Sequence, residues 1–288
     1  MPFRLPIFRG CDLLIATALL AVLILCLASI APLAAAEKAP LVLGETWTIE
    51  SKILGETRRI NVYLPPGYAE ADAARFPVLY MPDGGMAEDF LHIAGLVQVS
   101  VGNGTMRPFL LVGIENTERR RDMTGPTENA EDKKIAPRVG GSEAFREFVR
   151  SELMPEVKRR YRTTEETAVI GESLAGLWVV EALLLAPDLF DTYIAFDASL
   201  WWNNDHLLEI GPEQLRKNTD ISKTLYFAMS GDKGVPELGE HFAQILQESA
   251  PAGLTWHYEK MPAEKHSTIY HPAALQAFRF LFKPPAAK

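Results

Sequence analysis

The chain has 288 residues, of which 48% are hydrophobic and 23% are charged, with 20 glycines and 20 prolines. This is the composition of an ordinary globular protein, and it excludes collagen-like, low-complexity and disordered classes. The formal net charge is −8, which makes nucleic acid a poor partner, because phosphate contacts need lysine and arginine.

The first 36 residues are typical of a secretory signal peptide. Arg4 and Arg9 precede an apolar run over 13–30, and Leu-Ala-Ala-Ala follows at 33–36, with small residues at the two positions that a signal peptidase reads. An uncleaved membrane anchor is the alternative, because about 18 apolar residues are at the lower limit of a spanning helix. We therefore predict a periplasmic or secreted domain over 37–288, with no membrane contact once the peptide is cleaved. Cys11 and Cys26 leave with the peptide, so this domain has no disulfide and no thiolate site.

The first half of the exported domain predicts a strand-rich beginning. Residues 45–51 and 59–64 are expected to form an antiparallel hairpin, because apolar and polar residues alternate in the second of them. Short continuous apolar runs at 76–81 and 110–114 are typical of strands that are covered on both faces. A helix is expected at 87–99. The polar stretch 115–141 is predicted to be a long loop, and such loops are usually functional or mobile.

The second half alternates helices and strands. Phe145, Phe148, Val149, Leu153 and Val157 have the spacing of one apolar helical face. Further strands are expected at 167–170, 192–196, 225–229 and 254–258, and further helices at 174–185, around 242–246 and at 272–282. This order predicts a three-layer α/β fold with a mostly parallel central sheet and an antiparallel N-terminal hairpin. In such sheets the chemistry lies at the carboxyl ends of the strands.

The strongest catalytic motif follows the strand at 167–170 and reads Gly-Glu-Ser-Leu-Ala-Gly over 171–176. A serine between small residues at a strand-to-helix junction is typical of a nucleophile elbow, which raises the hydroxyl above the sheet. Ala175 stands where G-x-S-x-G has its second glycine. The alternative is an ordinary helix N-cap. We expect Ser173 to be the nucleophile.

A serine nucleophile needs a base and an acid that orients the base. His266 follows the last predicted strand, where this architecture delivers its base, and His271 is the second candidate. Asp232 follows the strand at 225–229 and is the expected acid, with Glu237 as the alternative. A catalytic pair of serine and histidine without an acid is a further alternative.

The oxyanion of a tetrahedral intermediate needs two backbone N–H donors. The first is expected at Leu174, directly after the nucleophile. The second is expected in the turn after the strand at 76–81, at Gly85 or Met86.

Three further residues are candidates for the substrate pocket. Trp201 and Trp202 follow the strand at 192–196 and could line a pocket for a bulky acyl group, although one of them is expected in the core. Arg121, in the predicted loop, could bind an anionic substrate group, or the loop arginines could simply be solvated. No metal or nucleotide motif occurs, so no cofactor is predicted.

Several blocks of the sequence are similar to the family of α/β-hydrolases that includes esterase D and the siderophore esterases related to enterochelin esterase. These blocks are R-I-N-V-Y-L-P-P-G-Y at 59–68, F-P-V-L-Y-M-P-D-G at 76–84, V-G-I at 112–114, R-D-M-T at 121–124, G-G at 140–141, E-L-M-P at 152–155, G-E-S-L-A-G at 171–176 and S-L-W-W at 199–202. His266 matches the position of the family's catalytic histidine. Two positions depart from the family: Glu172 stands where it often has histidine, and Asp197-Ala198 where it often has Ser-Pro.

The resemblance implies ester hydrolysis through an acyl-enzyme without a cofactor. Family substrates include siderophore trilactones, feruloyl and acyl-sugar esters and S-formylglutathione. We therefore expect a serine esterase acting on a small-molecule ester. The alternatives are acyl transfer to a sugar or lipid alcohol by the same residues, and a non-catalytic binding module that keeps the fold.

Overall fold

The computed structural model describes residues 1, 15, 17, 18, 20, 38–70 and 72–285. The chain divides into two units, Met1–Val42 and Leu43–Lys288. The predicted signal peptide lies almost entirely outside the described residues, and so does its cleavage site. None of the helices in the described part of the chain has the length and hydropathy that spanning a bilayer requires.

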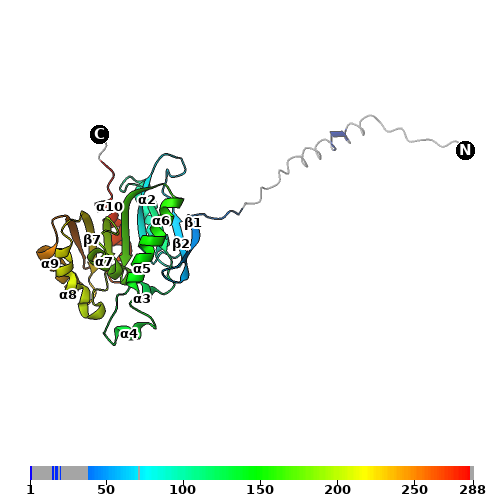
Figure 1. Cartoon of the computed structure of the whole chain (residues 1–288). Helices are drawn as coiled ribbons and strands as arrows, with labels where there is room; N and C mark the ends of the chain where they lie inside the picture. The colour runs from blue at the N-terminus through cyan, green and yellow to red at the C-terminus, as the bar shows by residue number, and fades with distance from the viewer. Residues whose placement is uncertain (2–14, 16, 19, 21–37, 71, 286–288) are drawn as a thin grey trace. The chain divides into compact units, whose positions relative to one another are not determined.

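The second unit is built on one eight-stranded sheet (Figure 1). Its strands are β1 (Glu45–Ser51), β2 (Glu56–Tyr63), β3 (Phe76–Pro82), β4 (Leu110–Ile114), β5 (Thr163–Glu172), β6 (Thr192–Phe196), β7 (Lys223–Ser230) and β8 (Leu254–Met261). The spatial order is β1-β2-β4-β3-β5-β6-β7-β8. β2 runs antiparallel to β1 and β4, and the other neighbours are parallel. The predicted fold, with its mostly parallel sheet and N-terminal hairpin, is confirmed.

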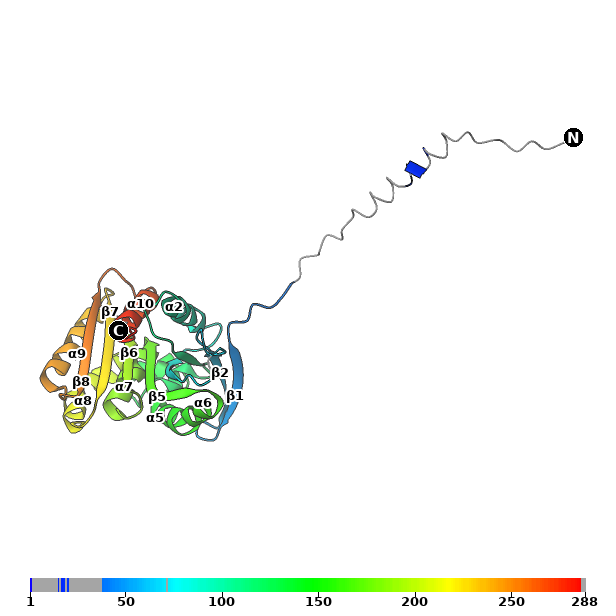
Figure 2. The same cartoon turned by 90° about the horizontal axis from the view of Figure 1, so that it is seen from above.

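Helices cover both faces of this sheet (Figure 2). One face carries α2 (Phe90–Gly102) and α10 (Tyr270–Leu281), which pack on each other. The other carries α5 (Ser142–Phe148), the π-helical turn η1 (Val149–Leu153), α6 (Met154–Arg160), α7 (Leu174–Leu185), α8 (Trp202–Lys217) and α9 (Val235–Ser249). The apolar face predicted between residues 145 and 157 is fully buried in this second layer.

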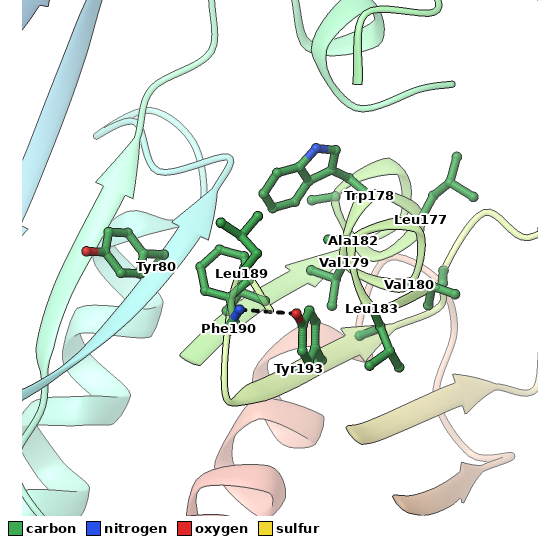
Figure 3. Packing of buried hydrophobic residues seen from close by; sticks show 14 of the residues in the cluster. Tyr80, Leu177, Trp178, Val179, Val180, Ala182, Leu183, Leu189, Phe190 and Tyr193 are labelled. Atoms are coloured by element: carbon green, nitrogen blue, oxygen red, sulfur yellow. Dashed lines mark hydrogen bonds between the residues drawn. The ribbon is translucent and has the colours of Figure 1, made fainter. Parts of the chain in front are cut away.

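The core has two parts because alternate residues of a strand point to opposite faces of the sheet. On β3, Val78 and Tyr80 belong to the part under α7, while Leu79 and Met81 belong to the part under α2 and α10. Figure 3 shows the first part, in which side chains of α7 lie beside Leu189 and Phe190 of the segment before β6 and Tyr193 of β6. The Phe190 amide there donates a hydrogen bond of 3.1 Å to the Tyr193 hydroxyl, which gives this buried polar group a partner.

Two features differ from the sequence-based expectation. The predicted loop 115–141 contains two short helices, α3 (Arg119–Asp122) and α4 (Asp132–Ile135). Helix α8 had no sequence signal, because it is polar and begins with a left-handed turn in which φ is 50° at Asn203 and 55° at Asn204. That turn is tied to the long loop, since the Asn203 amide donates to Asp132 (2.8 Å) and Asn129 donates to Asn204 (2.9 Å).

Candidate active site

Ser173 lies on a sharp turn between β5 and α7. Its φ of 60° and ψ of −119° are unusual for a residue with a side chain. Strand and helix approach closely here, because a Cβ on Gly171 would lie 2.6 Å from the Ala175 carbonyl carbon and one on Gly176 would lie 2.9 Å from the Phe196 carbonyl oxygen. The sequence of small residues therefore folds as a nucleophile elbow and presents the Ser173 hydroxyl at the carboxyl edge of the sheet.

His266 reaches this hydroxyl from the loop between β8 and α10. Its Nε2 lies 3.1 Å from Ser173 Oγ, which is a hydrogen-bond distance. The imidazole is 47% exposed, so substrate and water can reach it. The backbone of the loop is held by Asp232, whose carboxylate accepts a 2.7 Å hydrogen bond from the His266 amide. The structure thus brings together the two residues that the sequence singled out as nucleophile and base.

The carboxylate beside the imidazole belongs to Asp197, the residue directly after β6. Its Oδ2 lies 3.1 Å from His266 Nδ1. The Asp197 side chain is fully buried, and it accepts hydrogen bonds from the Ser230 amide (2.6 Å) and the Ser230 hydroxyl (2.7 Å). These two donors fix a buried carboxylate on the side of the ring opposite to Ser173.

The expected acid, Asp232, does not reach the ring, because its carboxylate is directed to the backbone of His266. The alternative, Glu237, is an exposed residue in the first turn of α9, and no hydrogen bond or ion pair of the described residues joins it to His266. The other histidine candidate, His271, lies at the start of α10 against His92. Sequence reasoning missed Asp197 because it placed the acid after the strand at 225–229. The available signal was an aspartate directly after a buried strand that neighbours the nucleophile's own strand.

A second carboxylate also faces the imidazole. Glu172 Oε1 lies 3.2 Å from His266 Nδ1. The hydrogen bond with Asp197 raises the pKa of His266 above its ordinary 6.5 against the opposing effect of burial, and the charge of Glu172 raises it further. Burial raises the pKa of Glu172 from 4.5 to about 7, although His266 and Arg119 oppose this shift. The base is therefore embedded in negative charge that favours its protonated form.

Two amides are suitably free to act as oxyanion donors. The amides of Leu174 and Met86 donate to no acceptor among the described residues. Gly85 was the other candidate, but its amide already donates a 2.6 Å hydrogen bond to Glu88. Of the two expected alternatives in this turn, Met86 is therefore the available donor.

The three predicted pocket residues have different environments. Trp201 is 43% exposed, whereas Trp202 is buried and its Nε1 donates to the Gly125 carbonyl (2.9 Å). Trp202 borders a cavity of about 240 Å³ that also touches Leu177, Leu207 and Ile210.

The expectation that Arg121 binds substrate is not supported by its position. Its guanidinium is engaged by the carboxylates of Glu56 (2.8 Å), Glu118 (3.3 Å) and Asp122 (2.6 Å). Although burial opposes it, hydrogen bonding led by Arg121 lowers the pKa of Glu56 to about 2. Arg121 thus joins the loop to β2. Its neighbour Arg119 lies nearer the site and forms a two-pronged ion pair with Asp83 (2.7 and 2.8 Å).

Donor atoms of Glu172, Asp197 and His266 all lie within 4.8 Å of one another, a spacing that a metal ion could bridge. Asp197 is already used by Ser230 and the imidazole, however, and the second ring nitrogen faces a serine. A hydroxyl, an imidazole and a buried carboxylate in sequence form the arrangement that activates a serine for attack on a carbonyl.

Comparison with known proteins agrees with this chemistry. A family model described as "Putative esterase" matches residues 51–234. Ferri-bacillibactin esterase BesA from Bacillus subtilis is 31% identical over 260 residues, which are 80% of this chain and 86% of that protein. The siderophore triacetylfusarinine C esterase of Aspergillus fumigatus is 30% identical over 171 residues, 52% of this chain and 54% of that protein.

Solved structures lead to the same family. An IroE-like serine hydrolase from Shewanella oneidensis superposes with a TM-score of 0.75 at 32% identity, over 83% of this chain and 80% of that one. Fold, site geometry and the extent of the family match agree on one assignment. The chain belongs to this esterase family of α/β-hydrolases and is a serine ester hydrolase.

Proposed function

We propose that the chain is an exported esterase that hydrolyses siderophore-type esters through an acyl-enzyme on Ser173, with His266 as the base and Asp197 as the acid. One observation carries the assignment of roles. Ser173 Oγ, His266 Nε2, His266 Nδ1 and Asp197 Oδ2 form a continuous line with two contacts of 3.1 Å. Each nitrogen of the ring therefore faces the partner that its role requires.

The reaction follows from this line of atoms. Ser173 Oγ attacks the ester carbonyl carbon while its proton moves to His266 Nε2, and Asp197 stabilises the imidazolium. The amides of Leu174 and Met86 donate to the oxyanion. His266 then returns the proton to the departing alkoxide, which leaves the acyl group on Ser173. Water, losing a proton to His266, attacks this acyl-enzyme. His266 then gives that proton to Ser173 Oγ as the acyl bond breaks, which releases the acid and restores the free serine.

Two observations support a siderophore-type substrate. The relatives with at least 30% identity that cover most of this chain include a ferri-bacillibactin esterase and an IroE-like serine hydrolase. The 240 Å³ cavity lies against Leu177, which follows Ser173 by one turn of α7 and so shares its face of the helix. Its walls of leucine, isoleucine and tryptophan suit an aromatic or aliphatic part of a bulky ester.

The catalytic roles are tested with p-nitrophenyl acetate and a fluorophosphonate probe. The wild type should give a burst of p-nitrophenol and stoichiometric labelling, and Ser173→Ala should abolish both. Ser267→Ala is the matched control, because Ser267 is an exposed serine beside His266. Full turnover by Ser173→Ala would refute the assignment of the nucleophile.

The substrate class is tested by a hydrolysis screen across catechol trilactones, feruloyl esters and short acyl sugars. A trilactone should give the highest kcat/KM. Ile210→Trp, which places a larger side chain in the cavity wall, should lower trilactone hydrolysis and leave p-nitrophenyl acetate hydrolysis within about twofold, because the small acetyl group does not need the cavity. An equal loss on both esters would contradict a role of the cavity in substrate binding.

Acyl transfer is the second candidate reaction, since the acyl-enzyme could be attacked by an alcohol instead of water. Product analysis with a competing sugar alcohol decides between the two. Free acid should remain the main product, and predominant ester formation would favour the transferase.

Export is tested on the intact chain. N-terminal sequencing of the protein recovered from a periplasmic or culture fraction should begin at residue 37. Recovery of the uncleaved chain in the membrane fraction would instead favour the anchor.

A further inference from the structure

Glu172 is the last residue of β5 and directly precedes Ser173. Its side chain is only 15% exposed, and its Oε1 is 3.2 Å from His266 Nδ1. That oxygen is buried and accepts no hydrogen bond from any residue that the structure describes. A buried carboxylate oxygen without a donor is costly, so its position against the ring calls for a physical reason.

The carboxylates of Asp197 and Glu172 both lie near His266 Nδ1, but they interact with the ring in different ways. A neutral imidazole carries one proton on this nitrogen, and that proton is directed at Asp197, which accepts the hydrogen bond. Glu172 therefore acts on the ring through its charge. Its effect is greatest when the ring is an imidazolium, which is the form His266 takes after it has removed the proton from Ser173 or from water.

The charged groups around Glu172 come from several elements. His266 and Arg119 favour its ionised form, whereas Asp197 after β6 and Asp89 before α2 oppose it. Tyr270 of α10 also lies within electrostatic reach. Glu172 and His266 lie 3.2 Å apart and each shifts the pKa of the other, so their titrations depend on one another.

We propose that Glu172 is a positioning residue for the proposed catalytic pair, a second counter-charge that stabilises the His266 imidazolium and keeps Nε2 directed at Ser173. This role rests on the proposed function of His266 as the base. It differs from the role of Asp197, because Asp197 accepts the Nδ1 hydrogen bond and Glu172 supplies charge alone.

The test compares Glu172→Gln with the charge-conserving Glu172→Asp. Glu172→Gln should lower kcat for p-nitrophenyl acetate about 10- to 100-fold with little change in KM, because the charge acts mainly in the transition state. The same loss of imidazolium stabilisation should lower the pKa of His266 by about one to two units. The acid limb of kcat/KM then shifts to lower pH, and an NMR titration of the His266 ring should show the same shift. Glu172→Asp should restore part of both.

Glu264→Gln is the matched control. Glu264 lies two residues before His266, but its carboxylate accepts a hydrogen bond from Thr268 and does not face the ring. This variant should leave kcat and the pKa of His266 unchanged. Folding of each variant is checked by near-UV circular dichroism.

Two outcomes would overturn the inference. One is an unchanged pKa of His266 in Glu172→Gln, even if kcat falls, because a purely structural role would give that pattern. The other is an unchanged kcat. Failure of the proposed function is separate: it appears as missing burst kinetics or as turnover by Ser173→Ala, whereas the NMR titration needs no activity.

Discussion

Asp197→Asn removes a charge from the buried acid while almost preserving its shape. The asparagine oxygen can still accept the hydrogen bond from the Ser230 amide, now 2.6 Å, and the Ser230 hydroxyl can rotate to accept from the new amide group. The side chain then presents N–H to His266 Nδ1, where Asp197 Oδ2 now lies at 3.1 Å. A neutral ring would have to carry its proton on Nε2, the nitrogen that must receive the proton of Ser173.

The loss of kcat in Asp197→Asn follows from the distances of Asp197 and Glu172 to the imidazole. Two unit charges about 4 Å apart at an effective dielectric constant of about 20 attract by about 4 kcal/mol, which corresponds to about 10³ in rate. Loss of the correct tautomer has lowered kcat by about 10⁴ where one aspartate serves the base. Here Glu172 remains 3.2 Å from Nδ1 and retains part of the stabilisation. We therefore expect kcat to fall about 10²- to 10³-fold.

The assay is the pH dependence of kcat/KM with p-nitrophenyl acetate. The wild-type acid limb should lie above pH 6.5, because the base acts in its neutral form and the hydrogen bond with Asp197, aided by Glu172, raises the pKa of His266 above that value. In Asp197→Asn the limb should move to lower pH as the plateau falls. Asp232→Asn is the comparison, because the Asp232 carboxylate binds the His266 amide and not the ring, and its charge raises the pKa of His266 less than Asp197 does. A larger loss in Asp232→Asn than in Asp197→Asn would refute the reasoning.

Three further predictions concern stability. Burial raises the pKa of Glu172 from 4.5 to about 7, so the stability that this group contributes is present below pH 4.5 and is lost as the pH rises to 7. In urea unfolding, the free energy of unfolding of Glu172→Gln should therefore exceed that of the wild type by up to about 3 kcal/mol at pH 8 and equal it at pH 4. Gly171→Ala should lower the free energy of unfolding by about 3 kcal/mol or more and reduce the soluble yield, because its Cβ would lie 2.6 Å from the backbone. The Cβ of Gly95→Ala in α2 would meet nothing within 4 Å, so this variant should raise thermal stability by about 0.5–1 kcal/mol. Arg58→Ala should cost about 3 kcal/mol in chemical denaturation, since it removes a fully buried partner 2.6 Å from Asp122; equal midpoints for variant and wild type would contradict this.

The layers of the fold were predictable from the sequence because buried apolar residues recur with the regular spacing of strands and helices. The strand at 76–81 and the helical face beginning at Phe145 are both fully buried, as their patterns indicate. The elbow at Ser173 was predictable because its tight backbone requires small neighbours. Helix α8 was not, because its left-handed start at Asn203 and Asn204 is stabilised by a distant loop and not by local propensity.

The partner of the imidazole was the least predictable part of the site. Asp197 follows β6 and Asp232 follows β7, both parallel strands, and both residues satisfy the chain order serine, acid, histidine. The choice depends on how the His266 loop lies over the sheet edge. The hydrogen bonds that hold this loop, from the His266 amide to Asp232 and from the Gly231 amide to the Glu264 carbonyl, are long-range in sequence. Likewise, the sequence does not show that Glu88 occupies the amide of Gly85 and leaves that of Met86 free.

The three proposed catalytic residues are carried by structural elements of different stability. Ser173 and Asp197 are attached to adjacent central strands, but His266 is carried by an exposed loop between β8 and α10. Backbone hydrogen bonds, such as the one from Gly231 to Glu264 at 3.0 Å, join that loop to the segment after β7. Opening this one segment separates base from nucleophile while the sheet stays intact. On heating, the enzyme should thus become reversibly inactive several degrees before its core melts, with cooling alone restoring turnover.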